Sequence, residues 1–488
     1  MEVTIMITNI KCKITSKLSY DQLCLLRDLC SFKVDGSDYK INAYKRKNIQ
    51  WDGRRKLFNM ETKEFPIGLL SRVIEFLGLY GIDVNLENNR PQNRTEFFYN
   101  IENYQSRDYQ TNAVLSSVTY GNGIIKAATG SGKTTIAART IAALGKKAIF
   151  VVHTRDLLYQ TIESFSRMFP DETIGQIGDG KYEPSTITVA TMQTLAKLGD
   201  IDYEKYKYDE DSDGYVETWE PENTVKTKFR EYSDTVGTVM FDEVQRICSI
   251  TAYTTRFLFK YANYAFGYSA SPWRDDGSDL MIEAAFGQRI VDITATSLIR
   301  QGYLVRPIID IYPIESGACA TGTYQQVYES AIVNNTLRNI RVVNDAYEQY
   351  KLGRNTLVLV TQIKHGEILE NMLCQAGAPA VFISGKSRMK KRTSVIQDMR
   401  DGKAPIVIAS TIADVGLDVP RLQSIVEAGA GKSSVTALQR LGRIMRPFDG
   451  KDLCYFITYR DSAMYLNSQM DKKIQIWQTE EDFIINEH

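Results

Sequence analysis

The stretch GIIKAATGSGKTTIAARTIAAL, residues 123–144, decides the fold of this 488-residue chain. It begins with an apolar run, turns through closely spaced glycines, and continues as an alanine-rich segment that favours a helix. A strand, a glycine turn and a helix in this order form a phosphate-binding loop, in which backbone N–H groups and the helix N-terminus surround an anion. The stretch therefore predicts a nucleotide site at the end of a parallel strand.

Each residue type in this loop has a predicted role. Gly130 and Gly132 allow the turn, Lys133 neutralises the terminal phosphates, and Thr134 offers a hydroxyl to Mg²⁺. Ala127 stands where the strict pattern G-x-x-x-x-G-K-[ST] has its first glycine. The loop residues predicted to bind the nucleotide are Thr129, Gly130, Ser131, Gly132, Lys133, Thr134 and Thr135.

A second Gly-Lys-Ser occurs in GAGKSS, residues 429–434, where Val426 replaces the first glycine. This Gly-Lys lies too close to the preceding apolar run to form a full loop. A glycine turn, with Ser433 or Ser434 as the N-cap of the next helix, is the favoured interpretation. A second nucleotide site is the alternative.

An acidic pair and a set of arginines supply the partners that ATP hydrolysis needs. TVGTVMFDEVQ, residues 235–245, is an apolar strand that ends in Asp242, expected to bind Mg²⁺ through water, and Glu243, expected to polarise the attacking water. In QRLGRIMRP, residues 439–447, Arg443 and Arg446 share one helical face with Gln439. We expect these arginines to reach the γ-phosphate from a second α/β unit.

Length and composition bound the class of protein. The chain exceeds what one hydrophobic core supports, and 43% hydrophobic with 24% charged residues is typical of globular domains. The formal net charge is zero, so any nucleic acid has to be held by local patches. The seven cysteines form no CxxC pair and predict buried free thiols in a reducing cytoplasm. With no apolar run of about 18 residues, we expect no membrane span.

Apolar β-branched runs alternate with helical stretches twice along the chain, which predicts an α/β fold with two tandem parallel-sheet domains. A small α+β domain, expected to bind duplex DNA, precedes them. The segment at about 201–233 is acidic and turn-rich, and we interpret it as a solvated insertion with a hairpin near DGYVETW, residues 213–219; a functional arm is the alternative. The predicted domains are 1–95, 104–297 with this insertion, 298–458, and a helical tail at 459–488.

Eight motifs in order resemble those of superfamily 2 helicases. They are RDYQ (107–110), ATGSGKT (128–134), VVHTRDLLYQ (151–160), VATMQTL (189–195), DEVQ (242–245), YSASPWRDDG (268–277), ASTIADVGLDVP (409–420) and QRLGRIMRP (439–447). The phosphate-binding loop of this superfamily usually lacks the first glycine, as here. Within it, SASPWRDDG, SLIRQGYLVRP (297–307) and the Trp51–Arg54 stretch are similar to the branch of XPB and the phage UvsW helicases.

The resemblance implies roles for further residues. Gln110, with Arg107, would bind adenine, Gly416 and Asp418 would lie near the ribose, and Arg443 and Arg446 would be arginine fingers. Ser269 and Ser271 match the motif that links the ATP site to DNA. Gln245 stands where many relatives have histidine and would bridge the neighbourhood of Glu243 to the second lobe. The resemblance also implies that the two tandem parallel-sheet domains are RecA-like, and that the cofactors are ATP and Mg²⁺.

Polar residues after the apolar strands predict a groove for the DNA backbone, because hydroxyls and amides at helix N-termini bind phosphates without sequence preference. Each of them alone is more often a helix cap, but they recur at the same topological position. The predicted groove residues are Thr154, Arg155, Thr191, Gln193, Thr361, Gln362, Ser410 and Thr411.

The segment 39–56 carries seven basic residues and one acid, with aromatic residues between them. A solvated basic strand is one interpretation, and a platform for duplex DNA is the favoured one. The predicted contacts are Lys45, Arg46, Trp51, Arg54 and Arg55.

The sequence thus predicts an ATP-dependent DNA helicase or translocase that unwinds or branch-migrates forked and four-way DNA in phage recombination, repair or replication. We expect a monomer in the host cytoplasm, with phage or host recombination and replication proteins as partners. An RNA-remodelling helicase and a non-catalytic nucleotide-gated DNA-binding module are the alternatives.

Overall fold

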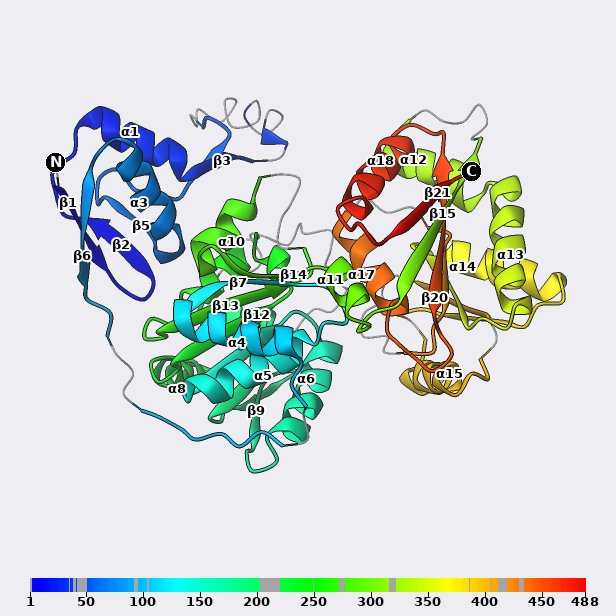
Figure 1. The fold of residues 1–488 in the computed structure, drawn as a ribbon, viewed down its shortest axis with the longest axis horizontal. Coiled ribbons are helices and arrows are strands. Elements are labelled where there is room, and N and C mark those ends of the chain that lie inside the picture. The colour runs from blue at the N-terminus through cyan, green and yellow to red at the C-terminus, as the bar shows by residue number, and fades with distance from the viewer. Residues whose placement is uncertain are drawn as a thin grey trace. The chain divides into compact units, whose positions relative to one another are not determined.

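The computed structural model describes residues 2–34, 36–37, 41, 51–91, 95–102, 105–201, 220–248, 250–271, 277–315, 322–385, 387–404, 406–410, 419–429 and 434–488. Contacts divide the chain into two compact units, drawn in Figure 1. The first unit comprises Met1–Ala127 and Gly132–Asp292, and the second comprises Ala128–Ser131 and Ile293–His488.

The first unit opens with a small α+β domain, as predicted. Strands β1 and β2 alternate buried side chains with more exposed ones, and the sheet order is β5-β2-β1-β6; β3 and β4 pair separately as a two-stranded antiparallel sheet. The helix at residues 20–29 begins with a capping box formed by Ser19 and Gln22. The elements are β1 (Glu2–Ile7), β2 (Lys11–Ile14), α1 (Tyr20–Leu29), β3 (Ser31–Lys33), β4 (Arg54–Lys56), β5 (Glu64–Pro66), η1 (Ile67–Leu69), α3 (Leu70–Leu79) and β6 (Asp83–Asn88).

This domain packs directly on helix α10 (Asp279–Phe286) of the following α/β domain. Its core cluster includes Leu280 and Ala284 from that helix. The Arg72 guanidinium donates two hydrogen bonds to Glu283, at 2.9 and 2.5 Å. A Cβ atom built on Gly68 would lie 1.9 Å from the carbonyl oxygen of Glu283, so only glycine allows this close backbone approach.

Replacement of Gly68 by alanine is expected to loosen this joint. The added methyl group meets backbone that cannot move without shifting α10, and overpacking of this kind costs about 1–3 kcal/mol. Urea unfolding and limited proteolysis of the segment between β6 and the α/β domain would measure the effect. Gly78→Ala on α3 is the matched control, because its Cβ meets nothing within 4 Å. Equal stability of the two variants would contradict the prediction.

The α/β domain of the first unit is built on an eight-stranded sheet of order β10-β9-β11-β8-β12-β13-β7-β14. Helices α4, α5 and α6 lie side by side on one face (Figure 1), while α7 and α10 contact the sheet and are joined through α9. The central strands are buried throughout, as expected of a parallel sheet covered on both faces. Its elements are α4 (Asp108–Tyr120), β7 (Asn122–Ala127), α5 (Lys133–Leu144), β8 (Ala148–Val152), α6 (Arg155–Met168), β9 (Ile174–Gly178), β10 (Lys181–Glu183), β11 (Ile187–Thr191), α7 (Met192–Leu198), α8 (Asn223–Ser233), β12 (Thr238–Asp242), η3 (Val244–Cys248), α9 (Ile250–Arg256), β13 (Tyr264–Ser269) and β14 (Arg289–Ile293).

The end of the acidic segment differs from the prediction of a solvated insertion. Residues 223–233 form α8, whose Phe229 and Tyr232 are buried in the domain core. The Tyr232 hydroxyl donates a 2.8 Å hydrogen bond to Thr188. The sequence did not predict this helix because charged residues surround its apolar positions and obscure their helical periodicity. The predicted hairpin at 213–219 lies outside the described residues.

The second unit contains a seven-stranded sheet of order β17-β18-β16-β19-β20-β15-β21, and its pairs are parallel. The C-terminal tail adds strand β21 at the sheet edge beside β15, which the prediction of a purely helical tail missed. The elements are α11 (Ala295–Arg300), β15 (Arg306–Ile314), α12 (Tyr324–Tyr328), η4 (Glu329–Val333), α13 (Thr336–Lys351), β16 (Thr356–Val360), α14 (Ile363–Gln375), β17 (Ala380–Ile383), α15 (Met389–Asp401), β18 (Ile406–Ser410), β19 (Ser424–Glu427), α17 (Ser434–Ile444), β20 (Leu453–Asp461), α18 (Leu466–Trp477) and β21 (Ile484–Glu487).

The cysteines agree only in part with the expectation of buried thiols. Of the cysteines whose side chains the structure describes, Cys12, Cys30 and Cys454 are buried, Cys24 is half-buried, and Cys374 is exposed, and these five are free; the side chains of Cys248 and Cys319 lie outside the described part. Burial raises the pKa of the Cys12 and Cys454 thiols to about 12, which keeps them protonated and unreactive at neutral pH.

Candidate functional site

The loop between β7 and α5 has the geometry of a phosphate-binding loop. Gly130 and Gly132 adopt φ values of 89° and 80°, in the left-handed region where glycine is favoured. A Cβ atom on Gly132 would lie 2.7 Å from Nε2 of Gln110. Ala127 is the buried last residue of β7 and is not among the residues with positive φ. The position where the strict pattern has a glycine therefore needs none here.

The acidic pair lies beside the lysine of this loop. Lys133 Nζ is 4.0 Å from Oε1 of Glu243 and donates a 3.4 Å hydrogen bond to the carbonyl oxygen of Ala127. Asp242 ends β12, and its Oδ1 accepts a 3.0 Å hydrogen bond from the backbone N–H of Glu243. Glu243 has a φ of 51°, an unfavourable backbone conformation that turns its carboxylate towards Lys133. The sequence expectation that these residues lie together agrees with this geometry.

The donor atoms fit a magnesium ion bound together with substrate phosphates. Burial, and next the Glu243 charge, raise the pKa of Asp242, while Lys133 opposes them. A nearby divalent cation would favour the ionised carboxylate. Within the described parts of the chain, no cluster of three or more His, Cys, Asp or Glu side chains could hold a metal ion. A Mg²⁺ site would therefore combine Asp242, the Thr134 hydroxyl, phosphate oxygens and water.

A hydrogen-bonded path leads from Glu243 to the end of the neighbouring strand. Gln245 Nε2 donates to Oε2 of Glu243 at 2.7 Å, and the Ser269 hydroxyl donates to Oε1 of Gln245 at 2.5 Å. The backbone N–H of Ser271 then donates to the Ser269 hydroxyl at 3.0 Å. Gln245 thus connects the acidic pair to the Ser269–Ser271 segment of its own domain, a partner that the sequence did not predict for it.

His153, at the end of β8, lies close to this path. Burial, and next the Arg246 charge, lower the pKa of His153 to about 3. The imidazole is therefore neutral at physiological pH, and it adds no charge to the site.

The predicted adenine-binding residues lie at the N-terminus of α4. Arg107 is the N-cap, and its backbone N–H donates to Oε1 of Gln110 at 3.3 Å. Its guanidinium donates to the Tyr109 hydroxyl at 3.0 Å. Gln110 is buried beside Gly132, which brings this motif into contact with the loop. These contacts fix the orientation of the Gln110 side-chain amide in the absence of a bound base.

In the second unit, the arginines of the QRLGRIMRP motif, residues 439–447, fall into two groups. Arg440 is buried and forms an ion pair with Glu427 at the end of β19. Lys473 of α18 lies 2.7 Å from the same carboxylate, and Thr458 donates to it at 2.8 Å. Burial opposes ionisation of Glu427, but the charges of Lys473 and Arg440 outweigh it and lower its pKa.

This Glu427 cluster was missed by sequence reasoning. The signal for it was a single glutamate at the end of the apolar run SIVEAG, residues 424–429. Arg443 and Arg446, the predicted fingers, are only half-buried, and burial lowers the pKa of Arg446. α17 begins at Ser434; Ser433, Gly416 and Asp418 lie outside the described residues.

Two family models match consecutive parts of the chain. Residues 103–274 match the family described as "Type III restriction enzyme, res subunit", and residues 337–447 match the "Helicase conserved C-terminal domain". The chain belongs to the superfamily 2 helicases. Together the two matches span the loop, the acidic pair and the arginine helix.

Viral relatives align with this helicase over most of its length. "Putative helicase 22" of Sulfolobus islandicus filamentous virus is 26% identical over 504 residues, covering 96% of this chain and 82% of its own. "ATP-dependent DNA helicase uvsW" of Enterobacteria phage T4 is 25% identical over 468 residues, covering 90% and 86%. Among solved structures, S. cerevisiae Dbp5 bound to RNA and ADP BeF3 has a TM-score of 0.53 at 15% identity, covering 79% and 90%, which supports the fold alone.

The predicted groove residues of the helicase lie at the C-terminal ends of parallel strands. Thr154 follows β8 and caps α6 by accepting a 3.2 Å hydrogen bond from Leu157, while Thr191 and Gln362 occupy the N-cap positions of α7 and α14. In each unit these positions share one edge of the sheet. The remaining members follow the same strand ends: Arg155 and Gln193 lie in the first unit, Thr361 and Ser410 in the second, and Thr411 lies outside the described residues.

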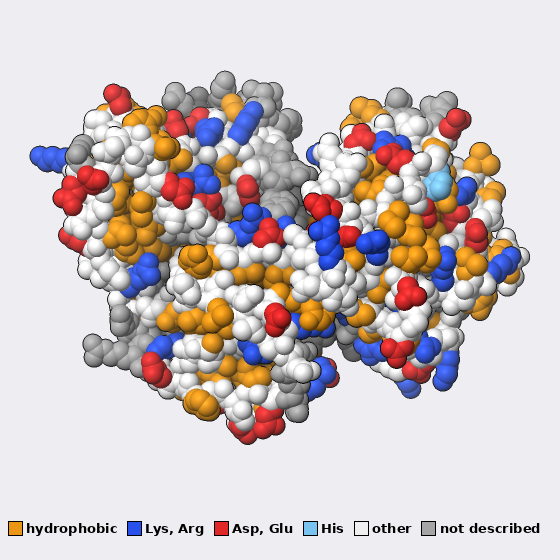
Figure 2. All heavy atoms as spheres, viewed as in Figure 1, with side chains coloured by type: hydrophobic (Ala, Val, Ile, Leu, Met, Phe, Trp, Pro, Cys, Tyr) orange, Lys and Arg blue, Asp and Glu red, His pale blue; other side chains and the backbone are white. Residues whose placement is uncertain are grey.

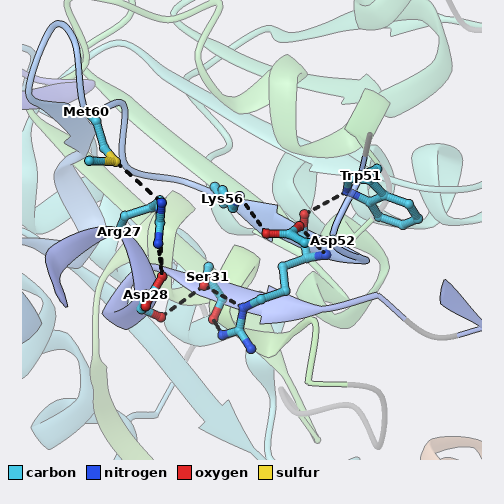
Figure 3. A network of polar contacts seen from close by, with 8 residues as sticks. Arg27, Asp28, Ser31, Trp51, Asp52, Lys56 and Met60 are labelled. Atoms are coloured by element: carbon cyan, nitrogen blue, oxygen red, sulfur yellow. Dashed lines mark hydrogen bonds and ion pairs between the residues drawn. The ribbon is translucent and has the colours of Figure 1, made fainter. Parts of the chain in front are cut away.

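The described part of the predicted duplex platform is a tight polar network (Figure 3). Trp51 Nε1 donates to the carbonyl oxygen of Arg54 at 2.9 Å, and the Arg54 guanidinium donates to the hydroxyl and carbonyl of Ser31. Arg55 donates to Sδ of Met281 at 3.2 Å, which links β4 to α10. Arg54 and Arg55 thus have structural partners, and Lys45 and Arg46 lie outside the described residues.

The surface of the helicase carries no large field of one sign on the face that Figure 2 shows, where Lys and Arg side chains are scattered among Asp and Glu. Contacts with phosphates would therefore be local, as the zero net charge predicts. None of the described helices combines the length and the apolar character that a bilayer crossing requires.

Proposed function

We propose that the protein is an ATP-driven DNA translocase that unwinds or branch-migrates forked and four-way duplexes in phage recombination, repair or replication. The observation that carries the proposal is the connected path from Lys133 through Glu243 and Gln245 to Ser269. Through this path, hydrolysis of the nucleotide at Lys133 and Glu243 could shift the strand ends that form the predicted DNA groove.

The hydrolysis step follows from the residues of the first unit. Lys133 would hold the terminal phosphates, and Gln110 would hold the base. Mg²⁺, held by Thr134 and Asp242, would neutralise charge on the phosphates. Glu243 would orient the attacking water and accept its proton, because its carboxylate is 4.0 Å from Lys133 and is oriented by Gln245.

Arg443 and Arg446 would complete this site from the second unit when the two units close on ATP. Arginine fingers of this kind stabilise the transition-state charge and couple hydrolysis to domain movement. Arg440 is not expected to act as an arginine finger, because its guanidinium forms a buried ion pair with Glu427.

DNA is favoured over RNA by the names of the sequence relatives, which include the phage DNA helicase uvsW. The RNA-bound structural neighbour shares only the fold. The decisive experiment compares ATPase stimulation by single-stranded, forked and four-way DNA with stimulation by RNA, and measures strand separation on the same substrates. We expect branched DNA to stimulate most. Stronger stimulation by RNA would favour the RNA-remodelling alternative, and no hydrolysis with any substrate would favour a nucleotide-gated binding module.

Neutralising two residues of the basic segment tests the duplex platform. Lys45→Gln with Arg46→Gln should weaken binding to branched DNA and reduce the slope of log Kd against log salt concentration by about 2, because each lost phosphate contact removes about 0.9. ATP binding should be unchanged. Arg167→Gln with Lys228→Gln, two exposed residues on α6 and α8, removes the same charge elsewhere and is the control. Equal affinities of both double variants would remove the platform from the proposal.

A further inference from the structure

Lys451 is a buried lysine whose ammonium group is hydrogen-bonded to backbone carbonyls. It lies in the turn between α17 and β20 of the second unit, and it is only 7% exposed. Its Nζ donates to the carbonyl oxygens of Pro420, Leu422 and Arg446, at 3.0, 2.6 and 2.9 Å. An ammonium has three N–H donors, so these bonds use all of them. Because all three acceptors are uncharged, burial of the ammonium is costly, and packing alone does not explain a lysine here.

The three carbonyls belong to the ends of two helicase motifs. Pro420 is the last residue of ASTIADVGLDVP, residues 409–420, and Leu422 follows it closely. Arg446 is the second predicted arginine finger and lies just beyond the end of α17. Lys451 therefore joins the end of the motif predicted to lie near the ribose to the end of the motif that carries the fingers.

Two backbone hydrogen bonds restrict the same region. The N–H of Val305 donates to the carbonyl oxygen of Met445 at 2.7 Å, and the N–H of Lys451 donates to that of Phe448 at 2.9 Å. The second bond closes a tight turn in which Gly450 has a φ of 77°, in the left-handed region that favours glycine. This turn reverses the chain after α17, which lets the Lys451 side chain reach back to Arg446.

We propose that Lys451 is a positioning residue for ATP hydrolysis, which fixes the backbone of Arg446 so that its guanidinium can reach the γ-phosphate when the two units close. The inference rests on the role proposed above for Arg446. Lys451 itself would not bind the nucleotide, because its three donors are occupied by carbonyls. A misplacement of about 1 Å can cost 10²-fold in rate, so the contribution of Lys451 would lie in kcat.

The ammonium titrates close to physiological pH. Burial lowers the pKa of Lys451 to about 8; of the smaller causes, the Cys454 thiol on β20 raises it and the Arg446 charge lowers it. Above this pH the neutral amine has only two N–H donors, so one of the three carbonyls loses its hydrogen bond. Positioning of Arg446 should therefore weaken, and hydrolysis should slow, as the pH rises through about 8.

Lys451→Met tests the proposal, because methionine keeps much of the side-chain length and removes the donors. We expect kcat for DNA-stimulated ATP hydrolysis to fall by about 10–10²-fold. The KM for ATP and the affinity for a fluorescent nucleotide should not change, because the residues proposed to hold the nucleotide lie in the first unit. Lys403→Met is the control: its side chain is 76% exposed, and this variant should hydrolyse ATP as the wild type does.

The pH profile of the wild type is a second readout that does not require the variant to fold. Its kcat should fall as the pH rises through about 8 while nucleotide affinity is retained, and Lys451→Met should lack this step. Wild-type kcat in Lys451→Met would overturn the proposal. A wild-type kcat that stays constant from one pH unit below the Lys451 pKa to one unit above it would overturn it as well.

Arg446→Gln, measured in the same assays, separates this inference from the proposed function. Normal hydrolysis by Arg446→Gln would overturn the finger assignment and the inference together. Impaired hydrolysis by Arg446→Gln beside normal hydrolysis by Lys451→Met would overturn the inference alone. Loss of kcat in both variants, with nucleotide affinity retained, would support it.

Discussion

Replacement of Glu243 by glutamine is expected to lower kcat for ATP hydrolysis by about 10²–10⁴-fold, the range that a positioned general base contributes. The glutamine side chain has nearly the same shape and can still accept the hydrogen bond from Gln245, which donates at 2.7 Å in the native protein. It cannot accept the proton of the attacking water. Lys133 and the loop remain intact, so binding of nucleotide and DNA should persist. Single-turnover ATPase assays and fluorescent-nucleotide titrations measure the two effects separately.

A matched control for this variant is Glu163→Gln on α6, where the side chain is 73% exposed and pairs with Arg167 at 3.9 Å. This control should hydrolyse ATP at the wild-type rate. If Glu243→Gln kept full turnover, Glu243 would not be the base. If it lost nucleotide binding instead, the carboxylate would act mainly by organising Lys133.

The parts of the ATP site that the sequence predicted are those carried by local patterns. A glycine turn between an apolar run and an alanine-rich segment predicts where α5 begins, and Lys133 is its first residue. The acidic pair at the end of an apolar run predicts the end of β12, and Asp242 is its last residue. Strand ends of a parallel sheet meet at one edge, so the two motifs come together without further information.

The contacts that escaped prediction connect residues far apart in the chain. Glu427 ends β19 and pairs with Lys473 on α18, with α17 and β20 between them in the sequence, and each of the two residues alone resembles an ordinary surface charge. Gly68 needs to be a glycine only because Glu283 approaches it from another domain. Strand β21 pairs at a sheet edge, and its four residues carry no periodicity strong enough to distinguish a strand from a loop. In each of these cases the structural role of the residue or strand depends on a contact with a distant part of the chain and not on its local sequence.

The other large expected effect is a loss of stability when a buried ion pair of the second unit is disrupted. Arg338 of α13 is 1% exposed, donates to Oδ1 of Asp461 at 2.9 Å, and donates to the carbonyl oxygen of Ala428 at 2.6 Å. Its guanidinium also lies 5.1 Å from the ring centre of Tyr459. These contacts hold α13 against the ends of β19 and β20, next to the Glu427 cluster that anchors the arginine helix.

Arg338→Met should therefore destabilise the second unit by about 3–5 kcal/mol, because it leaves the Asp461 carboxylate buried without its partner. Urea denaturation followed by circular dichroism measures the loss. Arg341→Met on the same helix is the control: its side chain is 42% exposed, and Tyr459 continues to donate to Asp345, so we expect a loss of about 1 kcal/mol or less. Adding Asp461→Asn to Arg338→Met removes the uncompensated charge and should restore part of the stability. If the double variant were no more stable than Arg338→Met alone, lost packing rather than the unpaired carboxylate would explain the effect.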